Sequence, residues 1–278
     1  EEWNFLERVL DFYETIQPDA LILQDLGVIK LLKERGSLIP RHFSTQGAWD
    51  GLGGLAFLQD LGVRRIILPR ELESAEIFRL ARASPLELEV FIHGAMCYST
   101  SGRCYWSAAL GTRSGNRGTC AQPCRKPYSE NGGKPEAVFS PQDLRLGRRI
   151  GELTSSGIAA LKIEGRMKDA AYVYHVVQTY RKLIDGETYQ EQHEKELDRV
   201  FSRPHHEGFW NGAPSSRWHT PEDGGRRFEM LGTSVGSPRS DGLQEVQSKK
   251  KIRTGDGLTW TLNGQRHGAR VTWVEPIP

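Results

Sequence analysis

All four cysteines of this 278-residue chain lie within one short window. The window reads HGAMCYSTSGRC and, a little later, GNRGTCAQPC, and it contains Cys97, Cys104, Cys120 and Cys124. In a reducing compartment, clustered cysteines are more typical of metal ligands or redox groups than of structural disulfides. The sequence therefore predicts a metal or redox site in a cysteine loop that covers residues 93–128.

The spacing of the cysteines discriminates between metals. Six residues separate Cys97 from Cys104, and three separate Cys120 from Cys124. Zinc ribbons and fingers use roughly two to four intervening residues at both ends, so the first pair is too wide for that pattern. An iron–sulfur cluster takes four thiolates without demanding one spacing. The pattern favours an iron–sulfur cluster, with zinc, or free or redox-paired thiols, as the alternatives.

The elements that must position this loop repeat one strand followed by one amphipathic helix. The apolar runs that predict strands are 19–25, 41–46, 64–70, 88–94, 137–143 and 160–166. Most starts lie about 23 residues apart, which suits one strand, one helix and two short loops. The repeat predicts an α/β domain with a parallel sheet over residues 1–205. Short alternating runs further on predict a linker and a small β-rich domain over 206–278.

Polar residues follow nearly every predicted strand. In repeated β/α units, chemistry lies at the carboxyl ends of the strands, where the following loops converge. We therefore expect two groups of site residues: His93, Lys162, Glu164 and Arg166 as catalytic side chains, and Thr45, Gln46, Arg70 and Arg125 as substrate-binding side chains. Each residue alone could equally cap a helix, and Lys162 with Glu164 could equally form a structural ion pair.

Charge and hydropathy indicate which kinds of partner and which location to expect for the protein. The net charge is only +2, so the field of the whole molecule is weak. Local basic clusters at 125–127, 145–149, 224–227 and 249–253 nevertheless keep RNA among the expected partners. No apolar run approaches the roughly 18–20 residues that span a bilayer, and the acidic start is unlike a signal peptide. A cytoplasmic protein without a membrane segment is the expectation.

At this point a resemblance emerges. EVFIHGAMCYSTSGRCYWS, residues 89–107, resembles the signature of the U32 peptidase family, the collagenase-like proteins that include RNA hydroxylation enzymes. Further family blocks follow in order, and they are HFSTQ (42–46), LPREL (68–72), NRGTCAQPCRKPY (116–128), SPQDL (140–144) and LKIEGRMKDAAYVYHVVQTYR (161–181). Trp106 departs from the usual aliphatic residue and leaves the cysteines intact. The resemblance covers roughly residues 19–215.

The resemblance implies a TIM-like (β/α) barrel whose cysteines bind a [4Fe-4S] cluster. It implies hydroxylation of a pyrimidine in tRNA or rRNA, with prephenate, a small carboxylate, as the oxygen donor, or a hydroxylation step in ubiquinone synthesis. Family members usually begin with further strand–helix units, so this chain is expected to lack the N-terminal units of the barrel. Arg145 stands where some relatives carry a cysteine, which leaves the ligands to the cysteine loop: all four, or three with one iron left open.

Two other functions stay open. One is a U32-type peptidase, although the chain contains no HExxH helix and no G-x-S-x-G elbow. Cys97 with His93 as nucleophile and base is conceivable, but four clustered cysteines are better explained as ligands. The other is a non-catalytic RNA-binding or assembly factor in which a structural metal shapes the loop.

Overall fold

The chain divides into two compact units, Glu1–Arg227 and Phe228–Pro278. The computed structural model describes residues 2–166, 168–198, 200, 203–213, 219, 232–235, 245–248, 251–262 and 265–275. The sequence predicts a domain boundary at 205–206. Residues just beyond that point belong to the first unit, where Trp210 is 4% exposed within the hydrophobic core.

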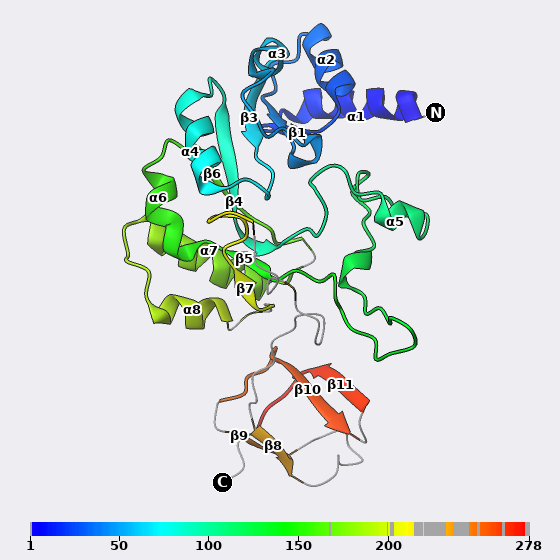
Figure 1. The fold of residues 1–278 in the computed structure, drawn as a ribbon, viewed down its shortest axis with the longest axis vertical. Coiled ribbons are helices and arrows are strands. Elements are labelled where there is room, and N and C mark those ends of the chain that lie inside the picture. Colours follow the sequence, from blue (N-terminus) through cyan, green and yellow to red (C-terminus); the bar gives the residue numbers. More distant parts are fainter. Residues whose placement is uncertain are drawn as a thin grey trace. The chain divides into compact units, whose positions relative to one another are not determined.

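A seven-stranded sheet forms the centre of the first unit (Figure 1). Its strands are β1 (Leu21–Leu23), β2 (Arg41–Phe43), β3 (Val63–Ile67), β4 (Glu87–Ala95), β5 (Asp143–Arg145), β6 (Ala160–Ile163) and β7 (His205–His206). Strands β1 to β4 are parallel neighbours in chain order, and β6 pairs in parallel with β4. The prediction of an α/β fold with a largely parallel sheet is confirmed. The described strands form an open sheet, so the TIM-like barrel is not shown.

Strand β5 corrects one prediction. The run 137–143 was expected to form a parallel strand, but β5 begins only at Asp143 and is antiparallel to β4. Pro141 lacks an N–H for a sheet ladder. Arg125 instead bonds Ser140 Oγ and Pro141 O, which holds this segment against the cysteine loop. Strand β7 then pairs in parallel with β5.

Helices follow most strands and cover the sheet. They are α1 (Glu2–Ile16), α2 (Leu26–Glu34), α3 (Leu55–Asp60), α4 (Ser74–Ala83), α5 (Trp106–Ala109), α6 (Ile150–Thr154), α7 (Ala170–Ile184) and α8 (Glu191–Asp198). Two of them begin at aspartate N-caps: Asp25 accepts from Val28 N at 3.0 Å and Asp169 from Tyr172 N at 2.8 Å. No helix in the described part of the chain combines the length and apolar character needed to cross a membrane.

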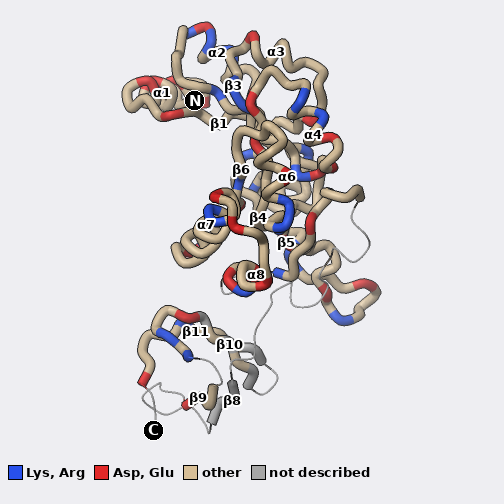
Figure 2. The backbone as a smooth tube through the Cα atoms, turned by 90° about the vertical axis from the view of Figure 1, so that its left-hand side faces the viewer, with Lys and Arg blue, Asp and Glu red and all other residues tan. Residues whose placement is uncertain are grey.

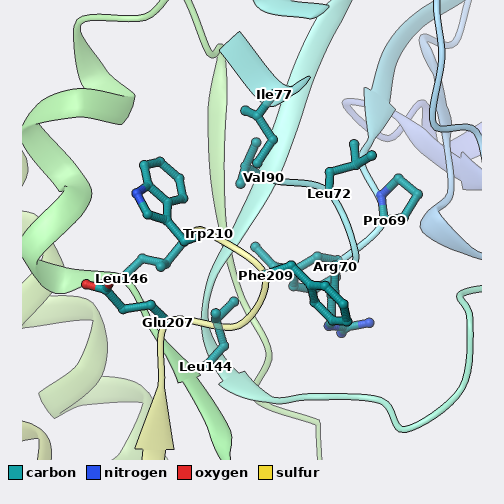
Figure 3. Close-up of a pocket in the computed structure, with 11 residues that line it drawn as sticks. Pro69, Arg70, Leu72, Ile77, Val90, Leu144, Leu146, Glu207, Phe209 and Trp210 are labelled. Carbon is teal, nitrogen blue, oxygen red and sulfur yellow. The ribbon is translucent and has the colours of Figure 1, made fainter. Parts of the chain in front are cut away.

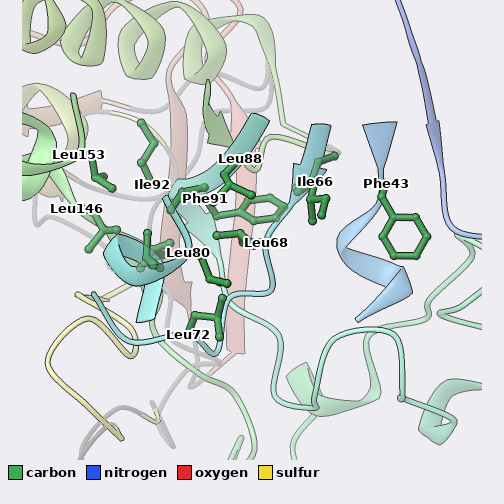
Figure 4. Close-up of a cluster of buried hydrophobic side chains, with 14 of the residues drawn as sticks. Phe43, Ile66, Leu68, Leu72, Leu80, Leu88, Phe91, Ile92, Leu146 and Leu153 are labelled. Atoms are coloured by element: carbon green, nitrogen blue, oxygen red, sulfur yellow. The ribbon is translucent and has the colours of Figure 1, made fainter. Parts of the chain in front are cut away.

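The main core lies between the sheet and its helices, with β4 in the middle (Figure 4). Leu88 and Ile92 of β4 join a buried cluster that also contains Leu80 of α4 and Leu153 of α6. The alternate residues Glu89, Phe91 and His93 are buried as well. Strand β4 is therefore buried on both faces, as expected for a central parallel strand, and it carries polar groups into the interior.

The second unit contains two antiparallel strand pairs. Strand β8 (Gly232–Val235) pairs with β9 (Glu245–Ser248), and β10 (Gly257–Leu262) pairs with β11 (Gln265–Arg270). All four strands fall within residues 206–278, where the sequence predicts a small β-rich domain. The basic cluster predicted at 224–227 lies outside the described residues.

Candidate functional site

The cysteine loop leaves the end of β4 and extends away from α4, α6 and α7 (Figure 1). Residues that follow other strands hold it there. Gln24, after β1, donates to Asn116 O at 2.7 Å. The carboxylate of Glu71, after β3, accepts from the backbone N and the hydroxyl of Ser101. The loop therefore lies across the carboxyl ends of the strands, where the β/α pattern places chemistry.

Gly102 allows the loop to touch the end of β2. Its φ is +73°, and a Cβ there would lie 2.1 Å from the carbonyl oxygen of Gln46. A side chain at this position would clash with backbone and would be strained in the left-handed region. Gln46, predicted as substrate-binding, thus contacts the loop through its main chain. Thr45 is buried and donates its hydroxyl to Leu68 O at 3.0 Å, so it fastens neighbouring backbone.

All four thiols are free and share one neighbourhood. The Cys97 thiol interacts electrostatically with the thiols of Cys104 and Cys124, and Cys124 interacts with Cys120. Ser107 Oγ accepts from Ala121 N at 2.9 Å and joins the two halves of the loop. Within the described residues, no three His, Cys, Asp or Glu side chains form a ready-made metal site. The four thiols thus lie on one loop, and in the described part of the chain they do not form a preformed metal site.

Two thiols are held mainly in the protonated form. Burial raises the pKa of Cys97, against the Ser99 backbone N–H and the Arg70 cation, which lower it. Burial likewise raises the pKa of Cys124, against the cation of Arg125. Since thiolates are the metal ligands, binding of a metal here must release protons.

Arg125 connects the two ends of the loop. Its Nη1 donates to Ser140 Oγ at 2.9 Å and to Pro141 O, and its Nη2 donates to Met96 O at 2.6 Å. Arg125 follows Cys124 in the chain and Met96 precedes Cys97, so one guanidinium joins the backbone beside the first and the fourth cysteine. Burial, and then the nearby Arg203, lowers the pKa of Arg125 to about 10, which keeps it charged at neutral pH. Arg125, predicted as substrate-binding, therefore donates its hydrogen bonds to residues at the two ends of the cysteine loop.

Arg70 and Glu164 are brought together as the strand-end pattern predicts. Arg70 Nη2 lies 3.0 Å from Glu164 Oε2, and its guanidinium carbon lies 3.7 Å from the centre of the Phe91 ring. The Arg70 cation also faces the Cys97 thiol. Gly94, with φ +104°, permits this approach because a Cβ there would lie 2.3 Å from Glu164 O. The pair therefore links the segment after β3 to the segment after β6, beside Cys97.

Arg166 does not join this pair through its side chain. Its backbone N donates to Glu164 Oε1 at 3.0 Å, and its guanidinium is exposed with no partner in the described part of the chain. Arg166 is thus available to a ligand, unlike Arg70.

Lys162 belongs to a ladder of ion pairs across three strands. Its Nζ lies 2.7 Å from Glu89 Oε1, and Glu89 Oε2 lies 3.2 Å from Arg65 Nη1. Arg65 in turn pairs with Glu87 at 2.7 Å. Every charge has a fixed partner on a neighbouring strand. The geometry favours the structural reading of Lys162 over a catalytic one.

Lys162→Met is expected to lower the free energy of unfolding by about 1–2 kcal/mol, because Glu89 loses one partner and keeps Arg65. A structural role for Lys162 predicts that the activity of the protein stays close to that of the wild type. Urea denaturation and nucleoside mass spectrometry measure the two effects. A large loss of activity at unchanged stability would make Lys162 a catalytic residue after all.

His93 is enclosed by α7. Its Nδ1 lies 3.2 Å from the hydroxyl of Tyr180, which itself donates to Ile92 O at 3.0 Å. The tyrosine hydrogen is thus used, so Nδ1–H of His93 donates to the tyrosine oxygen and Nε2 is the acceptor nitrogen. Burial lowers the pKa of His93 to about 3, helped by the nearby Arg145, His205 and Lys168. The imidazole is neutral at physiological pH and is a weak base.

The low pKa of His93 predicts acid sensitivity. In the unfolded chain, His93 has a pKa of about 6.5 and is protonated below that pH. In the folded chain, His93 stays neutral down to about pH 3. Stability attributable to His93 is complete above pH 6.5 and falls by up to about 1.4 kcal/mol per pH unit below it. Denaturation at several pH values should show a shallower acid loss in His93→Gln than in the wild type. Equal slopes of stability against pH in the two proteins would contradict the low pKa of His93. Any effect of acid on the thiols is common to both proteins and cancels in the comparison.

A group of cations beside His93 was missed by the sequence analysis. Arg203 Nη1 pairs with Asp143 Oδ1 at 3.1 Å, and burial lowers the pKa of the nearby Lys168 to about 8. Arg145 is 4% exposed and pairs with Asp198 at 2.8 Å, while its Nε and Nη1 have no hydrogen-bond partner among the residues that the structure describes. Buried donors without acceptors are costly, so this group is suited to an anion. The sequence marks Arg145 only as part of the basic cluster 145–149 and as the replacement of a cysteine.

A small cavity lies near this region, lined by Arg70, Phe91, Leu144 and Trp210 among others (Figure 3). Its volume of about 20 Å³ is close to the space of a single water. This cavity is too small to hold an organic ligand.

Comparison with known proteins finds one matching family and several relatives whose names describe RNA hydroxylation. The model of Peptidase family U32 matches residues 1–220. The tRNA hydroxylation protein P of Helicobacter pylori is 39% identical over 199 residues, which are 66% of this chain and 47% of that protein. The tRNA hydroxylation protein P1 of Bacillus subtilis is 36% identical over 299 residues, covering 99% of this chain and 71% of that protein.

A third relative is described as acting on ribosomal RNA. The 23S rRNA 5-hydroxycytidine synthase of Escherichia coli is 38% identical over 184 residues, which are 64% of this chain and 28% of that protein. No solved structure matches the chain. The chain spans about half the length of the Helicobacter pylori protein and less than a third of the Escherichia coli one.

Proposed function

The chain belongs to peptidase family U32, and from this premise we propose that it takes part in hydroxylating a pyrimidine of tRNA or rRNA, with an iron–sulfur cluster held by the cysteine loop. The proposal includes a cytoplasmic location, where thiols stay reduced and RNA is present. It also includes a TIM-like barrel, of which the parallel strands β1 to β4 and their helices would form one part.

One observation carries the proposal: four free thiols are gathered on one loop that strand-end residues hold across the sheet. Cys97, Cys104, Cys120 and Cys124 would hold the cluster, which supplies one-electron redox chemistry when bound. Arg125 positions the backbone beside the outer two cysteines. Arg70 places a buried cation beside Cys97, where it offsets the negative charge of thiolates.

The cations around Arg145 support a small carboxylate as co-substrate. Arg145 offers two buried nitrogens, Nε and Nη1, without acceptors in the described part of the chain, and Arg203 and Lys168 add positive charge. Charge-assisted hydrogen bonds to a carboxylate would satisfy such donors. His93 lies within the same group and presents a neutral imidazole, which can accept a hydrogen bond without adding charge.

The test is a gene deletion followed by mass spectrometry of nucleosides from tRNA and rRNA. One modified pyrimidine should lose the mass of a single oxygen atom, and the wild-type gene should restore it. Anaerobically purified protein should be brown and contain about four irons per chain. An unchanged nucleoside profile together with cleavage of gelatin would favour the peptidase that the family name suggests.

Geometry does not favour that peptidase. His93 contacts Tyr180, and the described residues contain no hydrogen bond between His93 and Cys97. A nucleophile and its base need such a contact, although it can be loose before substrate binds. A zinc-loaded, colourless protein with a normal nucleoside profile would instead indicate the non-catalytic factor.

A further inference from the structure

The cysteine loop carries a charge pattern that differs from that of the chain as a whole. The chain has 37 basic and 35 acidic residues, and the two kinds are interspersed along the first unit (Figure 2). Residues 93–128 contain five basic residues and no Asp or Glu, and the five are Arg103, Arg113, Arg117, Arg125 and Lys126. A sustained basic segment without acids is typical of contact with a polyanion.

The five basic residues are not equivalent. Arg125 donates to Met96 O, and Arg113 donates to Thr119 O and Cys120 O, so both already have acceptors within the loop. Arg117 forms only an exposed pair with Glu2, which adds little stability. Arg103 and Lys126 are exposed and have no partner in the described part of the chain. These last two are free to contact phosphates.

Aromatic rings accompany the charges. Most belong to a small cluster in which Trp106 contacts Tyr98, Tyr128 and Phe139 with ring centres 5.1–6.1 Å apart. This cluster is explained as a hydrophobic core of the loop. Tyr105 is different: it is 69% exposed and makes no ring contact among the described residues. It directly follows Cys104, just as the half-packed Tyr98 directly follows Cys97.

We propose that the cysteine loop is the docking surface for an unpaired segment of RNA, with Tyr105 stacking on a base and Arg103 and Lys126 contacting phosphates. Exposed rings interleaved with unpaired cations are how proteins bind single strands, whose bases offer free faces. The bases of a duplex are already stacked on one another and cannot use Tyr105. The inference rests on the proposed function for RNA as the partner, and it places the target base beside the thiols.

Binding of a fluorescent RNA hairpin with an unpaired loop tests the stacking. Tyr105→Ala should weaken binding about tenfold, while Tyr105→Phe should bind like the wild type because the ring remains. A fully paired RNA of the same length should bind weakly to all three proteins. Tyr174→Ala, which removes a 60% exposed tyrosine from α7, is the matched control and should change nothing.

The salt dependence of the same binding tests the charges. Replacing Arg103 and Lys126 together by Ala should reduce the slope of log affinity against log salt by about 1.4, since each phosphate contact to a single strand contributes about 0.7. Replacing Arg79 and Arg82, two exposed arginines of α4, should leave the slope unchanged. All variants are purified anaerobically, so that equal iron content shows an intact loop.

Unchanged affinity in Tyr105→Ala and an unchanged slope in the double variant would overturn the inference. Equal binding of paired and unpaired RNA would overturn it as well. Failure of the proposed function would be visible separately, as an unaltered nucleoside profile after gene deletion. Hydroxylation in cells with normal RNA binding by both variants would keep the function and reject this docking surface.

Discussion

On the proposed function, Cys97→Ala is expected to yield a folded protein without iron and without RNA hydroxylation. Cys97 is the thiol that neighbours both Cys104 and Cys124, so its loss removes the ligand between the two halves of the loop. Cys97 lies outside the hydrophobic core, so its removal creates no core cavity, and the free energy of unfolding of the apo protein should change by less than about 0.5 kcal/mol. Iron analysis, visible absorbance and nucleoside mass spectrometry measure the result.

Thr100→Ala is the matched control, because Thr100 lies in the same exposed turn and only its backbone accepts a bond, from Arg103 N. It should keep iron and activity. Single replacements of Cys104, Cys120 and Cys124 then count the ligands. If three cysteines are essential and one is dispensable, one iron of the proposed cluster has no cysteine ligand. Arg145 cannot serve as that ligand. Full activity in Cys97→Ala would make the loop merely structural.

The α/β repeat could be predicted because its period is set by local geometry. The apolar runs from 19 to 94 became β1 to β4, and the ends of β1 to β3 came together at the cysteine loop as parallel strands require. The pattern could not tell which polar side chains stay available to a ligand. Thr45 and Lys162 occupy the predicted ends, yet a buried carbonyl and a neighbouring carboxylate take up their donors.

The cationic group around Arg145 could not be predicted for a topological reason. Arg145, Lys168 and Arg203 lie far apart in sequence and follow no common period. They meet because β5 runs antiparallel to β4 and β7 pairs with β5, whereas the repeat predicts only parallel strands. Side-chain bonds from Arg125 hold residues 140–141 ahead of β5, and such long-range contacts leave no local signal in the sequence.

Arg125→Ala is expected to separate the two ends of the cysteine loop. The change removes the donors to Met96 O, Ser140 Oγ and Pro141 O, in a place where the guanidinium is partly buried. Hydrogen bonds from a charged donor contribute about 1.5–3 kcal/mol each, and losses among neighbours are not additive. Affinity for the cluster should fall about 10- to 100-fold, as for other residues that orient metal ligands. Retained iron after mild chelation measures the effect.

Arg125→Lys and Lys126→Ala separate positioning from substrate binding. Lysine keeps the charge but cannot bridge three acceptors from one plane, so Arg125→Lys should also lose iron, by a smaller factor. Lys126→Ala removes the neighbouring exposed cation and should keep iron. If Arg125→Ala kept its full iron content and lost only RNA affinity, Arg125 would be the substrate-binding residue that the sequence predicted. Loss of iron in both Arg125 variants, with iron retained in Lys126→Ala, assigns Arg125 to the architecture of the cysteine loop.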